Sequence, residues 1–185
     1  DPSTTDYFGV KESTLDTVAG KIPTANTGLK LLGAPIEIDT ANTGWLADGT
    51  LRRFGGPDLV ARYLPALTAT DLDALRQGAM FMTEQGAGSD IATTAVLAGE
   101  APDGTWRLTG DKWFCSNPDA GMALVLARRQ GGPAGLRGVS LFLLPRDLPD
   151  GTRNAYRIVR LKDKLGSRSM ASGEVRLEGA TVFLV

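Results

Sequence analysis

The sequence contains no histidine and a single cysteine, Cys115, and these shortages exclude several kinds of active site. Without histidine there is no Ser-His-Asp triad, no Cys-His pair and no histidine-ligated metal, and the commonest acid–base group near neutral pH is missing. One cysteine permits neither a disulfide within the chain nor a cysteine-based zinc site.

Net charge and long apolar runs are also scarce. The 185 residues carry 20 Lys and Arg against 21 Asp and Glu, so the charge of −1 gives no support to nucleic-acid binding. No apolar run reaches the roughly 18 residues of a membrane helix, and no leader pattern begins the chain. We therefore expect a cytoplasmic protein with no membrane contact. Because the chain begins at Asp1, either its start was processed or it is a piece of a longer protein. Its end on apolar residues leads us to expect a truncation there.

The composition, 42% hydrophobic and 22% charged, is that of one globular domain with an appendage. Residues 1–78 are expected to form a partial N-terminal region of loops and two short helices. The first helix is predicted to begin at Pro57 and to be broken by Pro65. The second is predicted from a cap at Thr68 or Thr70 to about Gly78, with Leu72 and Leu75 on one face.

From Ala79 onward the chain consists of short apolar or alternating runs separated by Gly, Pro, Asn and Asp, a pattern typical of strands. The strands are expected at 80–83, 93–98, 106–109, 112–116, 123–128, 139–144, 156–162, 173–177 and 181–184. Tight turns are expected at 109–111 and 178–180. This pattern predicts a mainly β fold, a barrel or sandwich, over residues 79–185.

Three polar blocks lie among these strands: Met80–Asp90, Thr109–Asn117 and Leu161–Met170. In the first, two glycines let a ligand approach the backbone closely because no Cβ intervenes. In the second, an aromatic beside a hydroxyl at a strand end can cover a flat ring and donate to its edge. Each block alone has a plainer interpretation: a turn after a strand, core aromatics, or a solvated basic face. Together they indicate a site for a flat ligand with polar edges.

In this order the blocks resemble the signature of the acyl-CoA dehydrogenase flavoproteins. Met82–Asp90 is similar to the family's Thr-Glu-x-Gly-x-Gly-Ser-Asp, Gly110-Asp111-Lys112 begins its second block, and Lys164–Ser169 is its third. The resemblance implies that residues 79–185 are the family's middle β-domain, a β-barrel or sandwich, and that the helical C-terminal domain is absent.

The resemblance also implies an FAD site and assigns its residues. The backbone of the first strand lies along the pyrimidine edge of the flavin, and Ser89 lies where FAD phosphate and acyl-CoA pantetheine contacts meet. Where the family has Trp-Ile-Thr, this chain has Phe114-Cys115-Ser116, with the aromatic against the flavin face and the hydroxyl near N5. The expected cofactor-binding residues are Met80, Phe81, Met82, Thr83, Gly88, Ser89, Phe114, Cys115 and Ser116, and Ser89 is also the expected substrate contact.

The implied activity is oxidation of the Cα–Cβ bond of an acyl-CoA thioester, with electrons passed to a flavoprotein acceptor by a full-length homo-oligomer. In the family the catalytic base is a Glu from the helical domain that follows. We therefore expect no catalytic residue in this chain and no activity from the chain alone. Glu84 and Asp90 are expected to have structural roles, with Asp90 capping backbone N–H groups of its loop.

Three alternatives remain open at this stage. The Phe114-Cys115-Ser116 departure resembles the subgroup related to the bacterial alkylation-response protein, which allows a flavin-containing, DNA-protective protein with little dehydrogenase turnover. An acyl-CoA oxidase, returning electrons to oxygen, has a related architecture. Composition alone also permits a β-barrel interaction domain with no cofactor.

Overall fold

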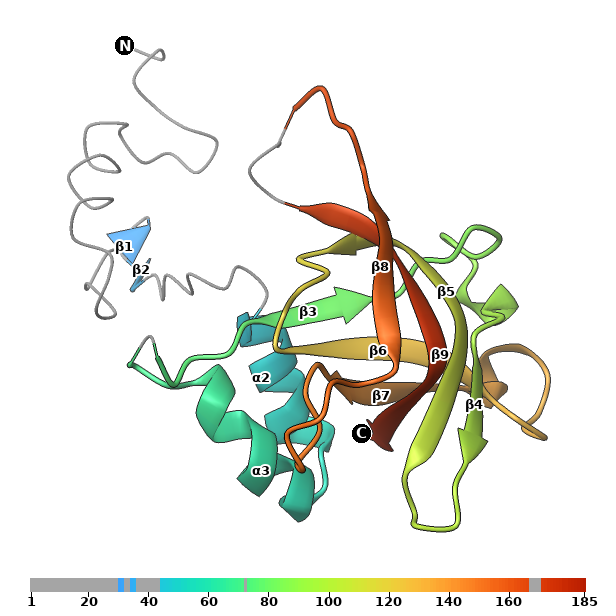
Figure 1. The fold of residues 1–185 in the computed structure, drawn as a ribbon, viewed down its shortest axis with the longest axis horizontal. Coiled ribbons are helices and arrows are strands. Elements are labelled where there is room, and N and C mark those ends of the chain that lie inside the picture. Colours follow the sequence, from blue (N-terminus) through green and yellow to red (C-terminus); the bar gives the residue numbers. More distant parts are fainter. Residues whose placement is uncertain (1–29, 32–33, 36–43, 72, 167–170) are drawn as a thin grey trace.

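The computed structural model describes residues 30–31, 34–35, 44–71, 73–166 and 171–185. They form a twisted β-barrel with two helices packed against one side (Figure 1). The helices are α2 (Gly44–Phe54) and α3 (Pro57–Leu67), and short 3-10 turns lie at Ile91–Thr93 and Gly135–Gly138. The strands are β1 (Lys30–Leu31), β2 (Ala34–Pro35), β3 (Gly78–Phe81), β4 (Leu97–Glu100), β5 (Trp106–Ser116), β6 (Met122–Arg129), β7 (Val139–Pro145), β8 (Tyr156–Leu161) and β9 (Ser172–Leu184).

Five strands close the barrel. β4, β5, β9 and β7 are hydrogen-bonded in that order, and β6 closes the ring by pairing with both β4 and β7. β6 pairs antiparallel with β7 over most of its length and parallel with β4 at Arg128 and Arg129. β3 adds to β6 as a parallel strand, and β8 adds to β9 as an antiparallel one. β1 and β2 form a separate two-stranded pair. The mainly β fold predicted from the sequence is confirmed.

Residues alternate between two apolar clusters along β6, as the period of two in a strand requires. Ala123, Val125 and Ala127 point into the barrel, where they meet Phe81 and Phe142. Their neighbours on the opposite face pack under α2 and α3, in a second cluster that contains Ala47, Leu51, Tyr63, Leu67, Met122, Leu124 and Leu143. The helices therefore cover the β3-β6-β7 side (Figure 1), where Phe183 near the end of β9 also contacts Tyr63 of α3. Among the described ranges, no helix is long and apolar enough to cross a bilayer.

The helices differ from the sequence prediction in three ways. α2 was not predicted, and the second predicted helix is wrong because the described residues from Thr68 to Gln77 form turns; Leu72 lies outside them. Pro65 does not end α3, which continues to Leu67. Only Ala66 and Leu67 follow Pro65 in the helix, and the buried Leu67 packs in the second cluster, so tertiary contact outweighs the local cost of proline.

Two predicted turns are also wrong, since they lie inside long continuous strands. Residues 109–111 belong to β5 and residues 178–180 to β9, and the two strands pair with each other through both segments. The glycines there serve a β-bulge: Leu108 pairs with Ala180 and Thr109 with Glu178, which leaves Gly179 as an extra residue at φ +81°. A bulge keeps both strands in the ladder while bending them. β4 also begins later than predicted, at Leu97.

Candidate functional site

The first two polar blocks and the start of the third come together at one end of the barrel. Trp113 N donates to Thr83 O at 2.8 Å, and Asn117 Nδ2 donates to Gln77 Oε1 at 2.7 Å. Residues 113–117 therefore run alongside residues 77–83 in the opposite direction. The start of the third block joins them at Lys162, whose ammonium lies 3.3 Å from the centre of the Phe114 ring. Asn117 N also donates at 2.9 Å to the carbonyl of Ala171, which lies just before β9. Ser167–Met170, the end of that block, lies outside the described residues.

The glycine-rich loop after β3 is fixed by short local hydrogen bonds. Glu84 N donates to Ala87 O at 2.8 Å, and Ala87 N donates back to Glu84 O at 3.3 Å. Asp90 Oδ1 accepts from Ala92 N at 3.0 Å and caps the 3-10 turn, as the sequence predicted. A Cβ added at Gly86 or Gly88 would meet nothing within 4 Å. The loop therefore holds its shape while leaving its outer surface open to a close ligand.

Phe114 is the most exposed aromatic of the second block. β5 leaves its register with β9 here, so that Trp113 and Phe114 together face the single residue Glu174. Phe114 adopts φ +55°, a left-handed conformation that is uncommon for a bulky side chain, and the residue is 57% exposed. Lys162, from the third block, places its ammonium 3.3 Å from the centre of the Phe114 ring. A cation over an aromatic face is a favourable electrostatic contact.

Beneath this surface lies a buried ion pair. Lys112 Nζ is 2.7 Å from Glu84 Oε1, and both side chains are almost wholly shielded from solvent. Burial lowers the pKa of Lys112, and the hydrogen bond from its ammonium to Glu84 acts in the opposite direction. The Glu84 carboxylate also accepts from the backbone N–H of Ala95 and Val96, at 2.7 and 3.2 Å. The Glu84 carboxylate is thus bonded wholly within the fold, which agrees with the structural role expected for it.

The predicted cofactor residues fall into two groups in the structure. Thr83 and Ser116 are half-buried, and Gly88, Ser89 and Phe114 are exposed. The others turn their side chains inward or only partly outward: Met80, Phe81, Met82 and Cys115. Phe81 and Cys115 are in the barrel core, so only their backbone atoms could reach a ligand. Burial also raises the pKa of Cys115 to about 12, which keeps it a neutral thiol.

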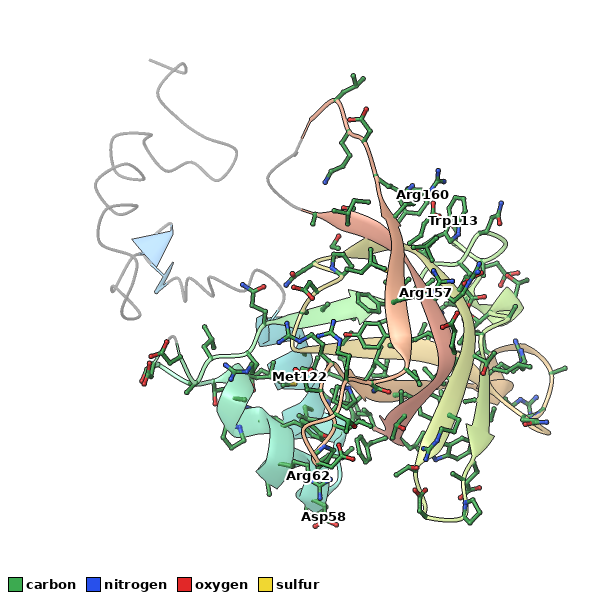
Figure 2. All side chains as sticks on the ribbon, viewed as in Figure 1. Asp58, Arg62, Trp113, Met122, Arg157 and Arg160 are labelled. Carbon is green, nitrogen blue, oxygen red and sulfur yellow. The ribbon has the colours of Figure 1, made fainter. Side chains whose placement is uncertain are left out.

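Sequence reasoning missed Lys112 and Lys162. A signal for Lys112 was present: it is four residues after the buried Leu108, so it shares the inward face of β5 and must find a partner there. No comparable signal marks Lys162, which the sequence placed in a solvated basic face. Arg157 and Arg160 do belong to such a face, where they pair with Glu178 and Glu174 (Figure 2).

Comparison with known proteins gives these features a family context. The model of the acyl-CoA dehydrogenase middle-domain family matches residues 79–180, more than half of the chain. The chain is 48% identical over 106 residues to the putative acyl-CoA dehydrogenase AidB of Escherichia coli K12, covering 57% of this chain and 18% of that protein. It is 38% identical over 136 residues to acyl-CoA dehydrogenase family member 11 of Caenorhabditis elegans, covering 71% of this chain and 22% of that protein.

Solved structures show the same fold. The apo form of Bd2924 superposes with a TM-score of 0.72 at 35% identity, covering 78% of this chain and 30% of that one. The Caenorhabditis elegans protein ACDH-11, in complex with C11-CoA, superposes with a TM-score of 0.68 at 33% identity, covering 78% of this chain and 25% of that one. The chain thus spans about a fifth of the two curated relatives' length. The similarity to AidB confirms the expected likeness to the alkylation-response subgroup.

Proposed function

The chain belongs to the acyl-CoA dehydrogenase family and contains its middle domain, and from this premise we propose that it forms the flavin-facing β-domain of an FAD-dependent oxidoreductase. The proposed reaction is oxidation of the Cα–Cβ bond of an acyl-CoA thioester. One observation carries the proposal: the first two polar blocks and the start of the third, far apart in sequence, meet at the Trp113–Thr83 hydrogen bond and the Lys162–Phe114 contact.

The residues at this end fit a flat cofactor with polar edges. The space around Gly86 and Gly88 is open, so a ring or phosphate can approach the backbone closely. Within the described part of the chain, the hydroxyls of Thr83, Ser89 and Ser116 form no hydrogen bond, and they are free to donate to a ligand. The Phe114 ring is exposed and has the Lys162 ammonium over one face, so a flat ligand would stack on the opposite face.

Each residue type then has a definite task. Thr83 and Ser116 donate hydrogen bonds to the ring edge, Ser89 binds phosphate or pantetheine oxygen, and Phe114 covers the ring face. Met80, Phe81, Met82 and Cys115 contribute through backbone atoms. The chemistry that bound FAD supplies is acceptance of a hydride from Cβ. Hydrogen bonds from this surface to the thioester carbonyl would stabilise negative charge that develops as the α-proton leaves.

The base that removes the α-proton is not Glu84. Its carboxylate is already occupied by Lys112 and by the N–H groups of Ala95 and Val96, and it lies beneath the surface. A catalytic base must reach the proton that it removes. As the family resemblance implies, we propose that the base is a carboxylate outside residues 1–185. The electron-accepting flavoprotein and the homo-oligomer expected for the family belong to the same proposal.

The test is the visible absorption spectrum of the full polypeptide that carries this chain, recorded during FAD titration and then during anaerobic addition of acyl-CoA thioesters of different length. A flavin spectrum that bleaches with one thioester would support the proposed activity and define its chain length. Oxygen consumption during turnover would indicate an oxidase instead. A protein that binds no flavin would contradict the proposal.

Two variants separate cofactor binding from folding. Gly88→Val should fold normally, because nothing lies within 4 Å of a Cβ there, yet it should bind FAD weakly because the side chain blocks the loop surface. Ser116→Ala should bind FAD but be reduced more slowly, since one hydroxyl near the ring edge is lost. Full FAD occupancy in Gly88→Val would remove the loop from the proposed site.

A second candidate follows from the 48% identity to AidB together with Phe114-Cys115-Ser116. In this alternative the protein binds flavin but turns over little acyl-CoA, and it protects DNA. It predicts a flavin spectrum that no thioester bleaches, together with DNA binding by the full polypeptide that weakens as salt is raised.

A further inference from the structure

The buried pair Lys112–Glu84 links the first two polar blocks beneath their surface. Lys112 Nζ donates to Glu84 Oε1 at 2.7 Å and to the backbone carbonyl of Met82 at 3.2 Å. The adjacent carbonyl, that of Thr83, accepts from Trp113 N. Groups on β5 therefore hold two consecutive carbonyls just beyond the end of β3.

Glu84 extends the link to a third segment. Its carboxylate accepts from Ala95 N and Val96 N, which lie between the 3-10 turn and β4. Residues 85–94 are thus bounded on one side by Glu84 itself and on the other by the two N–H groups that bind its carboxylate. The loop that carries Gly88 and Ser89 is closed by this carboxylate and by the ammonium that neutralises it.

Stability alone gives a weak reason for such a pair. Two charges lose their hydration when buried, and a well-packed apolar pair of similar volume is often as stable or more stable. An apolar pair could not, however, donate to Met82 O or accept from two backbone N–H groups. What the ion pair provides beyond packing is the fixed direction of these polar backbone atoms.

We propose that Lys112 and Glu84 are positioning residues of the flavin site, which hold the end of β3 and the glycine-rich loop in their binding geometry against the Trp113–Phe114 bulge. This inference rests on the proposed function. It predicts a preformed site, because every donor and acceptor of the hydrogen bonds that define it belongs to the chain itself. A preformed surface binds more tightly because little further ordering is needed on binding.

The test compares Lys112→Met, Glu84→Gln and the double variant in the full polypeptide, with FAD dissociation constants and denaturant unfolding measured for each. Each single variant leaves one buried charge without the opposite charge that neutralises it, and should lower both stability and FAD affinity. The double variant buries no charge, and its amide oxygen at position 84 can still accept from Ala95 and Val96. It should regain much of the lost stability while FAD binding stays about tenfold or more weaker, since Met82 O still lacks its donor.

The matched control is the exposed pair Arg176–Asp111, which lies next to Lys112 along β5 and β9. Arg176→Gln with Asp111→Asn should leave FAD affinity unchanged. The inference is overturned if FAD affinity recovers together with stability in the double variant, which would make the pair a packing feature only. If the unmodified protein binds no FAD, the proposed function itself fails. That result differs from failure of this inference, in which the unmodified protein binds FAD and the double variant binds it equally well.

A second measurement on the unmodified protein covers the case in which the variants do not fold. Amide hydrogen exchange at Ala95 and Val96 should be slow without FAD and change little when FAD is added, because both N–H groups are already bonded to Glu84. Protection that develops only with FAD would mean that the cofactor, not the ion pair, orders this segment, and the inference would be wrong.

Discussion

Strands β5 and β9 are interrupted by two bulges, and the two are built from opposite kinds of residue. At the first, Gly179 is the extra residue on β9, and the neighbouring Gly110 on β5 has φ +138°. At the second, the extra residue is on β5, where Phe114 adopts φ +55° although it has a bulky side chain. The first bulge uses glycine where the backbone demands it, whereas the second holds an aromatic residue in a conformation that glycine prefers.

The difference separates a structural bend from a candidate binding surface. At the first bulge, β5 presses against the buried Val96, with no room for a side chain at Gly110. At the second, the strand turns Phe114 outward and Cys115 inward, and the exposed ring lies where the three polar blocks meet. Backbone strain of this kind costs about 1–3 kcal/mol and concentrates at functional sites. The fold can accommodate it at Phe114 because the ladder resumes at once with Cys115 and Gly173.

The largest effect is expected at the glycine bulge. A Cβ at Gly110 would lie 2.9 Å from Val96 Cγ2 and 3.1 Å from Val96 Cα, so Gly110→Val adds steric overlap to an unfavourable φ. Overpacking and backbone strain each cost roughly 1–3 kcal/mol, so we expect a loss of about 2–6 kcal/mol in the free energy of unfolding. Denaturant unfolding measures it.

Gly179→Ala is the matched control, because it has φ +81° and nothing within 4 Å of its Cβ. It should lose only the strain contribution, about 1 kcal/mol. Equal losses in the two variants would show that contact with Val96 is not what makes the first bulge intolerant of side chains.

The next effect concerns Cys115, which the second bulge turns into the core. Burial raises its pKa from 9.0 to about 12, so between these values the unfolded chain loses a proton that the folded chain keeps. Stability is therefore fully present below pH 9 and falls as the pH rises toward 12. The upper limit is about 4 kcal/mol, from roughly 1.4 kcal/mol per pKa unit.

The measurement for Cys115 is the difference between the unmodified protein and Cys115→Ala in unfolding free energy as a function of pH. Other groups that titrate at alkaline pH, such as Tyr156 with a pKa raised by burial to about 12, cancel in this difference. The difference should shrink from pH 9 upward. A difference that stays constant with pH would mean that the Cys115 thiol ionises as readily in the folded protein as in the unfolded one.

The two bulges also show how far the sequence can predict this molecule. Alternation and turn residues located most of the strands and the mainly β class, because those signals are local. The segments 109–111 and 178–180 were predicted as turns because a glycine with positive φ has the same sequence pattern in a turn and in a bulge. Only the pairing partner separates the two, and for β5 that partner is the distant strand β9.

The sequence also indicated part of the candidate site, namely the segments that form it, but not every contact between them. The three blocks identified the residues that now lie together, since each has a distinctive composition. The burial of Lys112 could have been predicted from its position on the inward face of β5. That Lys162 covers Phe114 could not, because the contact depends on how the β8–β9 hairpin places a flexible side chain over a bulge in another strand.

A smaller effect tests the strain at Phe114 directly. At an ordinary strand position alanine is more stable than glycine by about 0.5–1 kcal/mol. At Phe114 the order should reverse, with Phe114→Gly more stable than Phe114→Ala by about 1 kcal/mol, because only glycine adopts φ +55° without cost. The same pair of variants at Arg107, which pairs with Thr181 in the regular part of the ladder, is the control and should keep the usual order. Both Phe114 variants should bind FAD more weakly. If alanine is the more stable at both positions, Phe114 is not strained.

The smallest effect is expected between the bulges, where Asp111 pairs with Arg176 on the barrel surface. Arg176 Nε and Nη2 donate to the Asp111 carboxylate at 2.8 and 3.1 Å, and this contact lowers the pKa of Asp111. An exposed pair contributes about 0.2–1 kcal/mol and is screened by salt. Asp111→Asn should therefore cost a few tenths of a kcal/mol.

Because the folded pKa of Asp111 is lowered, this contribution is present above the ordinary aspartate pKa and lost as the pH falls through the lowered value. Unfolding measured at neutral and at strongly acidic pH should show the difference between the two proteins disappearing in acid. A cost as large as that of Lys112→Met would mean that the ladder between the bulges, rather than the buried pair beneath it, holds the two blocks together.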